Sequence, residues 1–336
     1  MELVIDARKI KDFGIGVYIE NLIKGLEGKI NFSLLCYKED LSSENCTYVK
    51  SRGYSIGEQW EIWRVLNRLK PELFHSPHYV FPVLYRGKII ITVHDVIHLL
   101  FPRFFSRAAR TYAKFMLSRG VTKAEIIITV SKKSKEDIIR LFPEAEGKIT
   151  VIHNGINPVF FAEPPQEEKR WAEKFSPYIL AVGNNKPHKR FDLLIKQFSR
   201  VKEKFPEINL VIAGWEGENK NGIHTVGKVT KERLAALYHK AEILVHPALY
   251  EGFGFPPFEA AACGTPVISS KVGAVEEILG DSVIYFEGED IAESILYALK
   301  NMDKIKEMGK RAQKIVKDLT WESSARKHLE IYRRLL

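Results

Sequence analysis

Short apolar runs recur along the first half of the chain, and most are followed by a stretch with helical spacing. The runs span residues 2–7, 31–37, 73–77, 88–95, 124–131 and 148–155. They are rich in Ile and Val and do not alternate with polar residues, which is typical of strands buried on both faces of a parallel sheet. Strands that alternate with helices predict successive βαβ units.

The pattern breaks at residues 158–177, which are charged and interrupted by prolines. This break predicts a linker at 161–177 between two domains. A second series of apolar runs follows, and an amphipathic segment at 321–336 then ends the chain with no strand after it. The runs of the second series span residues 178–183, 209–214, 223–227, 243–247, 266–270 and 282–286.

The two series predict an α/β protein with two doubly wound, Rossmann-like domains at 1–160 and 178–318, followed by a helix at 319–336. The length of 336 residues agrees with two domains. Open parallel sheets bind ligands beyond the carboxyl ends of their strands, so we expect the domains to face each other across a cleft. The loops at the strand ends are therefore the places to search for chemistry.

Composition limits the cellular compartment and the classes of binding partner that we expect for this chain. No apolar run approaches the ~18 residues of a membrane-spanning helix, and the first residues lack the layout of a signal peptide. Cys36, Cys46 and Cys263 have no paired spacing, so we expect a cytoplasmic, reducing environment. The formal charge of +9 fits nucleic acid, an anionic membrane surface or phosphorylated ligands. Because the chain has no nucleic-acid-binding motif, we expect no nucleic-acid partner.

Two glycines lie in the loop after the first strand. Gly14 and Gly16 precede a predicted helix, where glycines let backbone N–H groups approach an anion. A flexible turn explains them equally well.

Histidines gather around the strand at 88–95. His94 ends this strand, and His75, His78 and His98 lie nearby in the sequence. Four histidines raise a zinc hypothesis, but the H-E-x-x-H pattern is absent and the context is a strand followed by a loop. We therefore favour His94 as a polar or acid/base group at a ligand site.

Basic residues gather after the strand at 178–183. Lys186, Lys189 and Arg190 directly precede a predicted helix. Positive charge at a helix N-terminus opposes the helix dipole, and a bound anion would compensate both. The loop therefore favours a phosphate site over a solvated run of charge.

The stretch "YEGFGFPPFEAAACGTPVI" at 250–268 places Glu251 and Glu259 eight positions apart. Its glycines free the backbone, and its prolines fit the first turn of a helix that carries Glu259, where the helix dipole favours a carboxylate. An ionised carboxylate only accepts hydrogen bonds, so it suits a vicinal diol of a sugar. The alternative is an exposed Glu251 and a capping Glu259. With the basic loop, this set of groups fits a nucleotide-diphosphate sugar.

The chain resembles the retaining glycosyltransferases of the GT-B fold, in the large mannosyltransferase-like family (glycosyltransferase family four, glycosyl transferases group one). The resemblance extends nearly from end to end, and its most specific block is the one that contains Glu251 and Glu259. The matching blocks are "GIGVYIENL", "HSPHY", "TVHDVIHLLFP", "IITVSKKSKEDI", "VIHNGINPVF", "PYILAVGNNKPHKRFDLLIKQF", "ALYEGFGFPPFEAAACGTPVI" and "TWESSARKHLEIYRRLL".

The resemblance implies a role for each matching residue of the second domain. Glu259 would hold the nucleotide ribose, and Lys189 would bind the diphosphate and stabilise it as the leaving group. Glu251 would contact the transferred sugar together with three backbone amides, those of Gly252, Phe253 and Gly254.

The resemblance also implies that His94 contacts the sugar near the reacting carbon, and that Gly14 and Gly16 complete the pocket. The terminal helix would cross back to the acceptor-binding N-terminal domain. One departure is Asn184, because many members carry an Arg there. Lys186 or Arg190 would have to compensate.

The implied activity is transfer of a hexose to a glycan or lipid-linked acceptor in cell-surface polysaccharide or glycolipid synthesis. Mannose from GDP-mannose is the expected donor by resemblance alone, and a UDP-sugar is the alternative. No D-x-D occurs, so we expect neither a metal nor another cofactor. A nucleotide-sugar epimerase of the same fold and a nucleic-acid-binding protein are the alternative functions.

Residues 101–123 mix Arg and Lys with Phe and Tyr. This segment is either a contact with an anionic membrane surface, at the inner face of the membrane, or an ordinary helix whose arginines extend to solvent.

Overall fold

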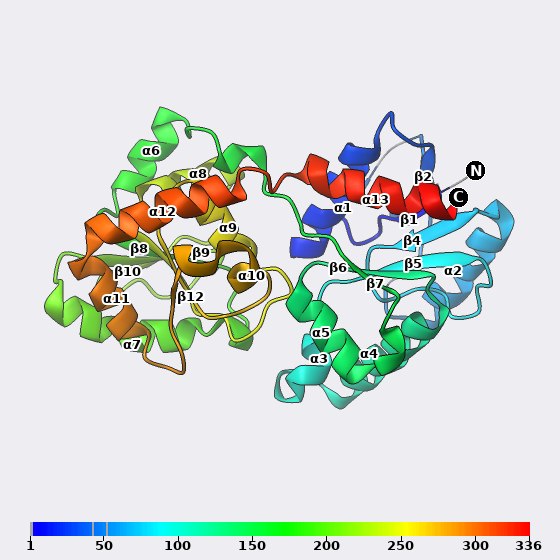
Figure 1. The fold of residues 1–336 in the computed structure, drawn as a ribbon, viewed down its shortest axis with the longest axis horizontal. Helices are drawn as coiled ribbons and strands as arrows, with labels where there is room; N and C mark the ends of the chain where they lie inside the picture. The colour runs from blue at the N-terminus through cyan, green and yellow to red at the C-terminus, as the bar shows by residue number, and fades with distance from the viewer. Residues whose placement is uncertain (1–2, 42–43, 52) are drawn as a thin grey trace. The chain divides into compact units, whose positions relative to one another are not determined.

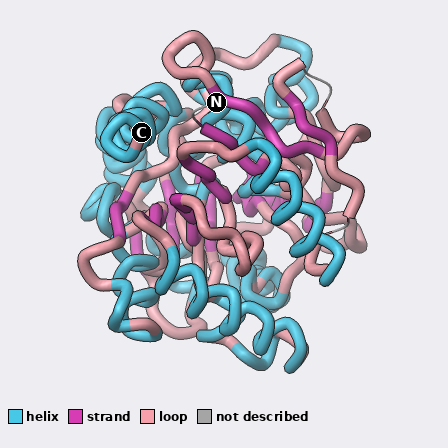
Figure 2. The backbone as a smooth tube through the Cα atoms, turned by 90° about the vertical axis from the view of Figure 1, so that its right-hand side faces the viewer, coloured by secondary structure: helices cyan, strands magenta, loops and turns pink. Residues whose placement is uncertain are grey.

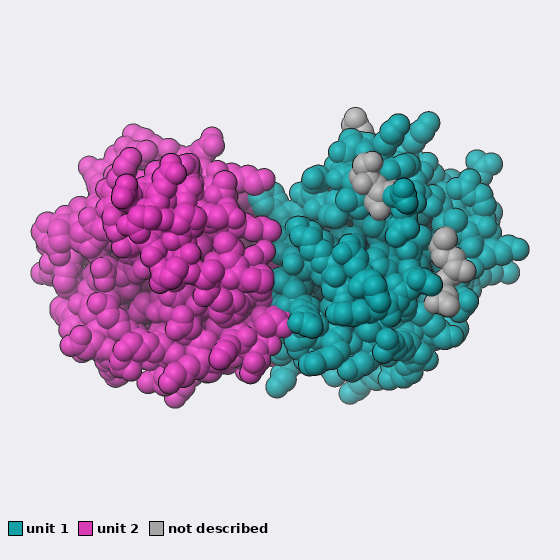
Figure 3. Space-filling model, turned by 90° about the horizontal axis from the view of Figure 1, so that it is seen from above, with its two compact units in different colours: residues 1–155, 321–336 teal, residues 156–320 magenta. Residues whose placement is uncertain are grey.

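The computed structural model describes residues 3–41, 44–51 and 53–336. The chain divides into two compact units (Figure 3), and we call residues 1–155 with 321–336 unit 1 and residues 156–320 unit 2. Each unit contains one parallel β-sheet, which confirms the predicted class of two α/β domains. The strands form inner layers with helices outside them (Figure 2).

Unit 1 has a seven-stranded sheet in the order β3-β2-β1-β4-β5-β6-β7, with every neighbouring pair parallel. Its elements in chain order are β1 (Leu3–Asp6), α1 (Phe13–Leu26), β2 (Phe32–Cys36), β3 (Cys46–Tyr48), α2 (Ile56–Leu69), β4 (Leu73–Ser76), β5 (Lys88–Val93), α3 (Ile97–Leu100), η1 (Pro102–Phe104), α4 (Arg107–Lys123), β6 (Ile126–Thr129), α5 (Lys132–Leu141), η2 (Pro143–Ala145), β7 (Ile149–Val151) and α13 (Trp321–Leu335).

The strands of unit 1 are buried on both faces because both faces carry aliphatic side chains. Val4 and Ile91 belong to a core that includes side chains of α2, α4 and α5. Neighbouring residues such as Ile5 and Ile90 are also fully buried and point to the opposite face. The last helix, α13, packs along α1 (Figure 1).

A buried hydrogen-bond network fixes α13 within unit 1. The hydroxyl of Tyr18 lies 2.6 Å from His328 Nε2 of α13 and 3.0 Å from Thr92 Oγ1 of β5. His75 Nε2 lies 2.9 Å from the same Thr92 oxygen, and its Nδ1 lies 2.6 Å from the Tyr332 hydroxyl of α13. All five residues are fully buried, so these polar atoms depend on one another for partners.

Helix α1 begins earlier than the sequence predicts. Gly14 and Gly16 were expected before the helix, but both lie in its first turns, because the helix starts at Phe13 with Asp12 as its N-cap. A Cβ at Gly16 would lie 2.3 Å from the carbonyl oxygen of Ile10. Gly16 is therefore required for the close approach of the preceding loop, whereas Gly14 is exposed.

Unit 2 has a six-stranded parallel sheet in the order β10-β9-β8-β11-β12-β13. Its elements in chain order are η3 (Pro158–Phe160), α6 (Gln166–Glu173), β8 (Tyr178–Val182), η4 (Pro187–Lys189), α7 (Phe191–Lys204), β9 (Asn209–Ala213), β10 (Ile223–Thr225), α8 (Lys231–Lys240), β11 (Ile243–His246), α9 (Phe255–Ala262), β12 (Val267–Ser269), α10 (Val275–Leu279), η5 (Gly280–Ser282), β13 (Ile284–Tyr285), α11 (Ile291–Lys300) and α12 (Met302–Val316).

The segment that the sequence predicts to be a linker at 161–177 contains helix α6, within unit 2. Helix α6 packs on α8, where Arg233 Nε donates to Glu168 Oε2 at 2.8 Å. The Arg233 guanidinium also lies 5.1 Å from the centre of the Trp171 ring. These contacts come from a helix about 65 positions away in sequence, so a local pattern does not reveal them.

Candidate functional site

The candidate site of unit 2 lies where its strand order changes direction. Strands β9 and β10 extend the sheet to one side of β8, whereas β11 begins the other side. Ligands of doubly wound sheets bind at the carboxyl ends of strands beside such a switch point. Lys189 follows β8 and Glu251 follows β11, so the two predicted residues belong to the two loops that meet there.

An ion pair joins these two loops. Lys189 Nζ donates to Glu251 Oε1, and the two side chains are only 14% and 15% exposed. His246 ends β11, and its Nε2 lies 3.7 Å from the same carboxylate oxygen. Within the described residues, this buried Nε2 has no hydrogen-bond partner. The site thus holds a paired cation, a carboxylate and an imidazole nitrogen that can still bond a ligand.

The protonation states at this pair follow from burial and charge. Burial is the largest single influence and would raise the pKa of Glu251, but the adjacent Lys189 ammonium, with contributions from His246 and His188, holds the pKa below its usual value. Burial lowers the pKa of His246 to about 4, and it lowers that of the neighbouring His188 to about 4 as well. At neutral pH Glu251 is therefore ionised and both imidazoles are neutral.

Glu259 has a different environment from Glu251. Burial raises the pKa of Glu259 to about 7, although a hydrogen bond from Tyr238 works against this increase. The Tyr238 hydroxyl of α8 donates to Glu259 Oε2 at 2.8 Å. We expected the helix dipole to favour this carboxylate, but Glu259 lies in the second turn of α9, where the influence of the dipole has faded. The Glu259 carboxyl is thus about half protonated near neutral pH, and a ligand that bonds it can shift this protonation.

The backbone between the two glutamates makes a sharp turn into α9. Gly254 is the N-cap with φ of 90°, a left-handed conformation that favours glycine. Pro256 and Pro257 occupy the first turn as predicted, and they have no N–H to offer. Phe253 is buried, and its ring stacks on Phe258 at 4.6 Å between centroids. The backbone N–H groups of this turn therefore belong to Phe255 and the residues before it.

The remaining residues of the basic loop lie in different surroundings. Arg190 donates to the carbonyl of Gly288 at 3.1 Å, which directs it toward the loop before α11. Lys186 is exposed as the N-cap of η4. The side-chain oxygen of Asn184 is buried, and no group in the described chain bonds it. Asn184 and Lys186 thus keep polar atoms available, whereas Arg190 has a structural partner.

His94 belongs to unit 1, where it directly follows β5. Its Nε2 donates to the carbonyl of Pro77 at 3.0 Å, and its ring meets that of Tyr18 edge-on at 4.9 Å between centroids. Burial lowers the pKa of His94 to about 4. A neutral imidazole whose Nε2 carries the proton presents Nδ1 as an acceptor, so His94 is suited to accept a hydroxyl hydrogen bond rather than to act as an acid.

The zinc hypothesis finds no support in the positions of the histidines. Both ring nitrogens of His75 are bonded within the buried network, and His78 Nδ1 accepts from the Val80 N–H at 3.3 Å. Across residues 3–41, 44–51 and 53–336 there is no group of three or more His, Cys, Asp or Glu side chains that could hold a metal ion.

Sequence reasoning missed two residues of this site, His246 and Tyr238. His246 carried a usable signal, because it lies near the end of the apolar run at 243–247 and therefore at the carboxyl end of a predicted strand. Tyr238 carried none, since it lies in the last turn of α8 and reaches Glu259 only through the packing of α8 on α9.

Two family models match the chain. The model of glycosyltransferase family 4 matches residues 14–160, and the model of glycosyl transferases group 1 matches residues 165–315. Together they span most of both units.

Similar proteins include two bacterial mannosyltransferases. The O-antigen chain mannosyltransferase RfbU of Salmonella typhimurium is 30% identical over 260 residues, which cover 73% of this chain and 69% of RfbU. The O-antigen chain mannosyltransferase B of Escherichia coli is 27% identical over 82% of this chain and 77% of its own length.

Solved structures show the same fold. HepE of Anabaena, solved in complex with UDP-glucose, superposes with a TM-score of 0.79 at 17% identity and covers 100% of both chains. This likeness confirms the two-domain GT-B fold.

Proposed function

Because this chain belongs to the family of glycosyl transferases group 1, we propose that it is a retaining transferase that moves a hexose from a nucleotide-diphosphate sugar to an acceptor hydroxyl. The observation that carries the proposal is the ion pair between Lys189 and Glu251 at the switch point of unit 2. Glu259 follows Glu251 by eight positions in the sequence. The pair supplies a cation for a diphosphate and a carboxylate for hydroxyl groups, and Glu259 supplies a second carboxylate, at the edge of the sheet where ligands bind.

Each group of unit 2 receives a role in this proposal. Lys189 exchanges its bond to Glu251 for the donor diphosphate, with Lys186 and Asn184 beside it. Glu251 then accepts hydroxyl groups of the sugar, while Gly252, Phe253 and Gly254 supply backbone contacts. Glu259 accepts both hydroxyls of the nucleotide ribose. In unit 1, Nδ1 of His94 accepts a hydroxyl of the sugar, and Gly14 and Gly16 border the donor.

The proposed chemistry needs no protein nucleophile. The bond from the anomeric carbon to the diphosphate oxygen breaks, which leaves an oxocarbenium-like carbon and a negatively charged leaving group. Lys189 stabilises that charge as it develops. The acceptor oxygen bonds the carbon on the same face, and its proton passes to the departing phosphate. Glu251 accepts hydroxyl groups of the sugar in this proposal, so it forms no covalent intermediate.

The names of the relatives support mannose as the hexose and a glycan or a lipid-linked glycan as the acceptor. We propose GDP-mannose as the donor, with a UDP-sugar as the alternative that the HepE complex suggests.

Within the described residues, no helix is both long and apolar enough to cross a membrane. Contact with an anionic membrane surface is assigned to residues 101–123, where Phe115 of α4 is 51% exposed. Sedimentation with vesicles that contain or lack anionic lipid tests that contact.

A thermal-shift panel of nucleotide sugars tests the donor assignment. A donor present at 100 times its Kd stabilises the folded protein by about 2.7 kcal/mol, so we expect the largest rise in Tm with GDP-mannose. A larger rise with UDP-glucose would move the assignment to a UDP-sugar. If no nucleotide sugar raises Tm, the proposal is wrong. Incubation with the donor alone separates the alternatives, because only an epimerase converts it to another sugar nucleotide without an acceptor.

The pKa of Glu259 predicts a specific pH dependence of donor binding. Only the ionised carboxylate accepts from both ribose hydroxyls, and its pKa is about 7. Affinity for the nucleotide, measured by calorimetry, should thus be constant well above pH 7 and fall about tenfold per pH unit below it. In Tyr238→Phe, which lacks the bond that opposes the raised pKa, the midpoint should move to higher pH. Glu259→Gln should bind weakly at every pH; a retained midpoint there would contradict the assignment.

A further inference from the structure

Unit 1 has a switch point of its own, between β1 and β4, and the roles proposed above leave most of it unused. The loop after β1 carries Arg8 and Lys9, and the loop after β4 carries His78. Ligands bind beside such a position in doubly wound sheets. The groups gathered there are therefore candidates for a second binding site.

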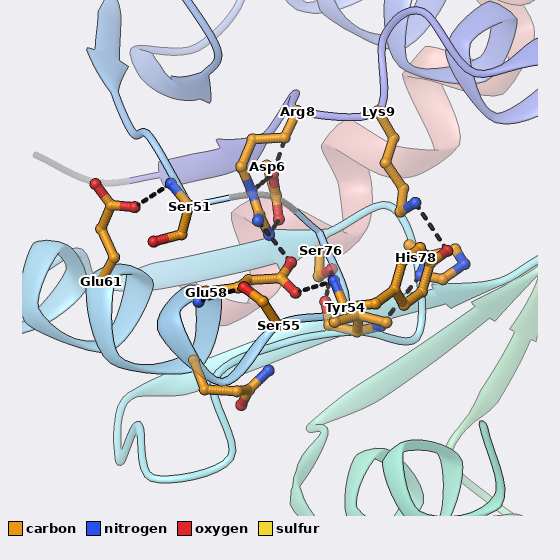
Figure 4. A network of polar contacts seen from close by, with 12 residues as sticks. Asp6, Arg8, Lys9, Ser51, Tyr54, Ser55, Glu58, Glu61, Ser76 and His78 are labelled. Carbon is orange, nitrogen blue, oxygen red and sulfur yellow. Dashed lines mark hydrogen bonds and ion pairs between the residues drawn. The ribbon is translucent and has the colours of Figure 1, made fainter. Parts of the chain in front are cut away.

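A buried ion network supports this edge of the sheet (Figure 4). Arg8 is 7% exposed and bonds Asp6 through Nε at 2.8 Å and Nη2 at 2.6 Å. Its Nη1 donates to Glu58 Oε1 at 2.6 Å. The second oxygen of Glu58 accepts from the backbone N–H of Tyr54 at 2.5 Å. Arg8 and Glu58 thus fix the position of the Tyr54 backbone.

Tyr54 has a backbone conformation that favours glycine. Its φ is 64°, in the left-handed region, and its side chain is nevertheless large and 54% exposed. Such conformations cost free energy and persist where the surroundings enforce them, most often at functional sites. The Glu58 bond is what enforces it here. An exposed aromatic ring held in this way is not explained by packing in the core.

Polar groups surround the Tyr54 ring: Lys9 Nζ lies over one face, 4.4 Å from the ring centre, and among the described residues no other ring is stacked parallel to it. Lys9 Nζ donates to the Tyr54 hydroxyl at 2.9 Å and to Asp12 at 3.1 Å. The rings of Tyr112 and His78 meet Tyr54 edge-on, at 5.8 and 6.3 Å between centroids. The Tyr112 hydroxyl is buried and, in the described chain, has no hydrogen-bond partner. Since His78 Nδ1 accepts from Val80, its proton is on Nε2, which is a donor.

We propose that Lys9, Tyr54, His78 and Tyr112 form a subsite for the acceptor, in which the apolar face of an uncharged pyranose ring stacks on Tyr54. An exposed aromatic ring surrounded by hydrogen-bond donors matches a sugar ring, which has an apolar face and hydroxyls on its edge. The charges nearby compensate one another, because Asp12 pairs with Lys9 while Asp6 and Glu58 pair with Arg8. A neutral ligand therefore fits better than an anion. This assignment rests on the proposed transferase function for its biological meaning.

The test is binding of methyl α-D-mannopyranoside to the full chain, measured by saturation-transfer difference NMR and by titration. We expect signals from the ring C–H protons with the wild type, and an affinity weaker by up to about tenfold for Tyr54→Ala, since one stacking contact is removed. Tyr54→Phe keeps the ring and should retain binding. Lys9→Met removes one donor and should weaken binding less than Tyr54→Ala.

Tyr297 provides a matched control in unit 2. It is 44% exposed, and Lys304 Nζ donates to its hydroxyl at 2.9 Å, as Lys9 does to Tyr54. Tyr297 lies in α11 and not at a strand end, so Tyr297→Ala should leave glycoside binding unchanged. An equal loss in both alanine variants would overturn the proposal by showing unspecific contact with exposed tyrosines.

Two further outcomes would overturn the subsite. One is unchanged glycoside binding in a folded Tyr54→Ala protein. The other is a Tyr54→Ala variant that loses binding to phosphatidylglycerol vesicles but keeps its glycoside affinity, which would make this surface a membrane contact. The glycoside assay contains no nucleotide. A protein that binds nucleotide sugars but shows no glycoside binding through Tyr54 would therefore contradict the subsite and leave the proposed transferase function intact. A protein that binds the glycoside through Tyr54 and no nucleotide sugar loses the proposed function but keeps the sugar site.

Discussion

Lys189→Ala is expected to lower kcat/KM for the sugar donor by about 10²–10³-fold. Removal of one preorganised donor that stabilises developing negative charge typically has an effect of this size. The variant also leaves Glu251 without the ammonium that keeps it ionised, so its pKa should rise above the usual value because burial then dominates. Steady-state kinetics with donor and acceptor measure the first effect, and the pH dependence of stability measures the second.

A second substitution separates the catalytic loss from the loss of stability. Adding Glu251→Gln to Lys189→Ala removes the unpaired carboxylate, so stability should recover while activity stays low. Lys310→Ala is the matched control, because its pair with Glu307 at 2.7 Å is 66% and 62% exposed and contributes little. Near-normal donor turnover in both Lys189→Ala and Glu259→Ala would contradict the placement of the donor site.

Thr92→Val is expected to destabilise unit 1 by about 3 kcal/mol, although the two side chains have nearly the same shape. His328 Nδ1 donates to the carbonyl of Ser324 at 2.8 Å, so its Nε2 must accept from the Tyr18 hydroxyl. The Tyr18 oxygen then accepts from Thr92, and Thr92 accepts from His75 Nε2. Valine leaves the His75 donor and the Tyr18 oxygen unsatisfied, at about 1–3 kcal/mol for each buried group.

Thermal unfolding measures this loss as a fall in Tm of about 6–12 °C, given roughly 2–4 °C per kcal/mol for domains of this size. Thr122→Val is the matched control. Its exposed hydroxyl donates to the carbonyl of Ser118 at 3.0 Å, and the change should cost less than about 0.5 kcal/mol. If Thr92→Val unfolds like the wild type, the assigned directions of the hydrogen bonds are wrong.

The sheets could be predicted from the sequence because parallel strands buried on both faces leave continuous runs of Ile and Val. The run at 124–131 contains β6, and that at 243–247 contains β11. Strand β3 was not anticipated, since it spans only Cys46–Tyr48 at the edge of the sheet and is partly exposed. Helix α6 was not anticipated either, because its stabilising contacts with α8 are distant in sequence.

The candidate site shows the same division between local and non-local information. Lys189 and Glu251 were found because each follows a predicted strand, and parallel strands bring their carboxyl ends together. Tyr238 was missed, and with it the cause of the unusual environment of Glu259. The chain order also gave no reason to select Tyr54. Its importance depends on a backbone angle and on a bond to Glu58, and neither is visible in residue types alone.

The position of α13 has a consequence for the order of folding during synthesis. The ribosome produces residues 1–155 first, but the partners of Tyr18 and His75 in α13 are made only after the whole of unit 2. Unit 2 is continuous in sequence and can fold as soon as it emerges, whereas unit 1 stays incomplete until α13 has been made. A chain that lacks the last 16 residues would thus expose an apolar groove beside α1 to chaperones and proteases, while unit 2 remained folded.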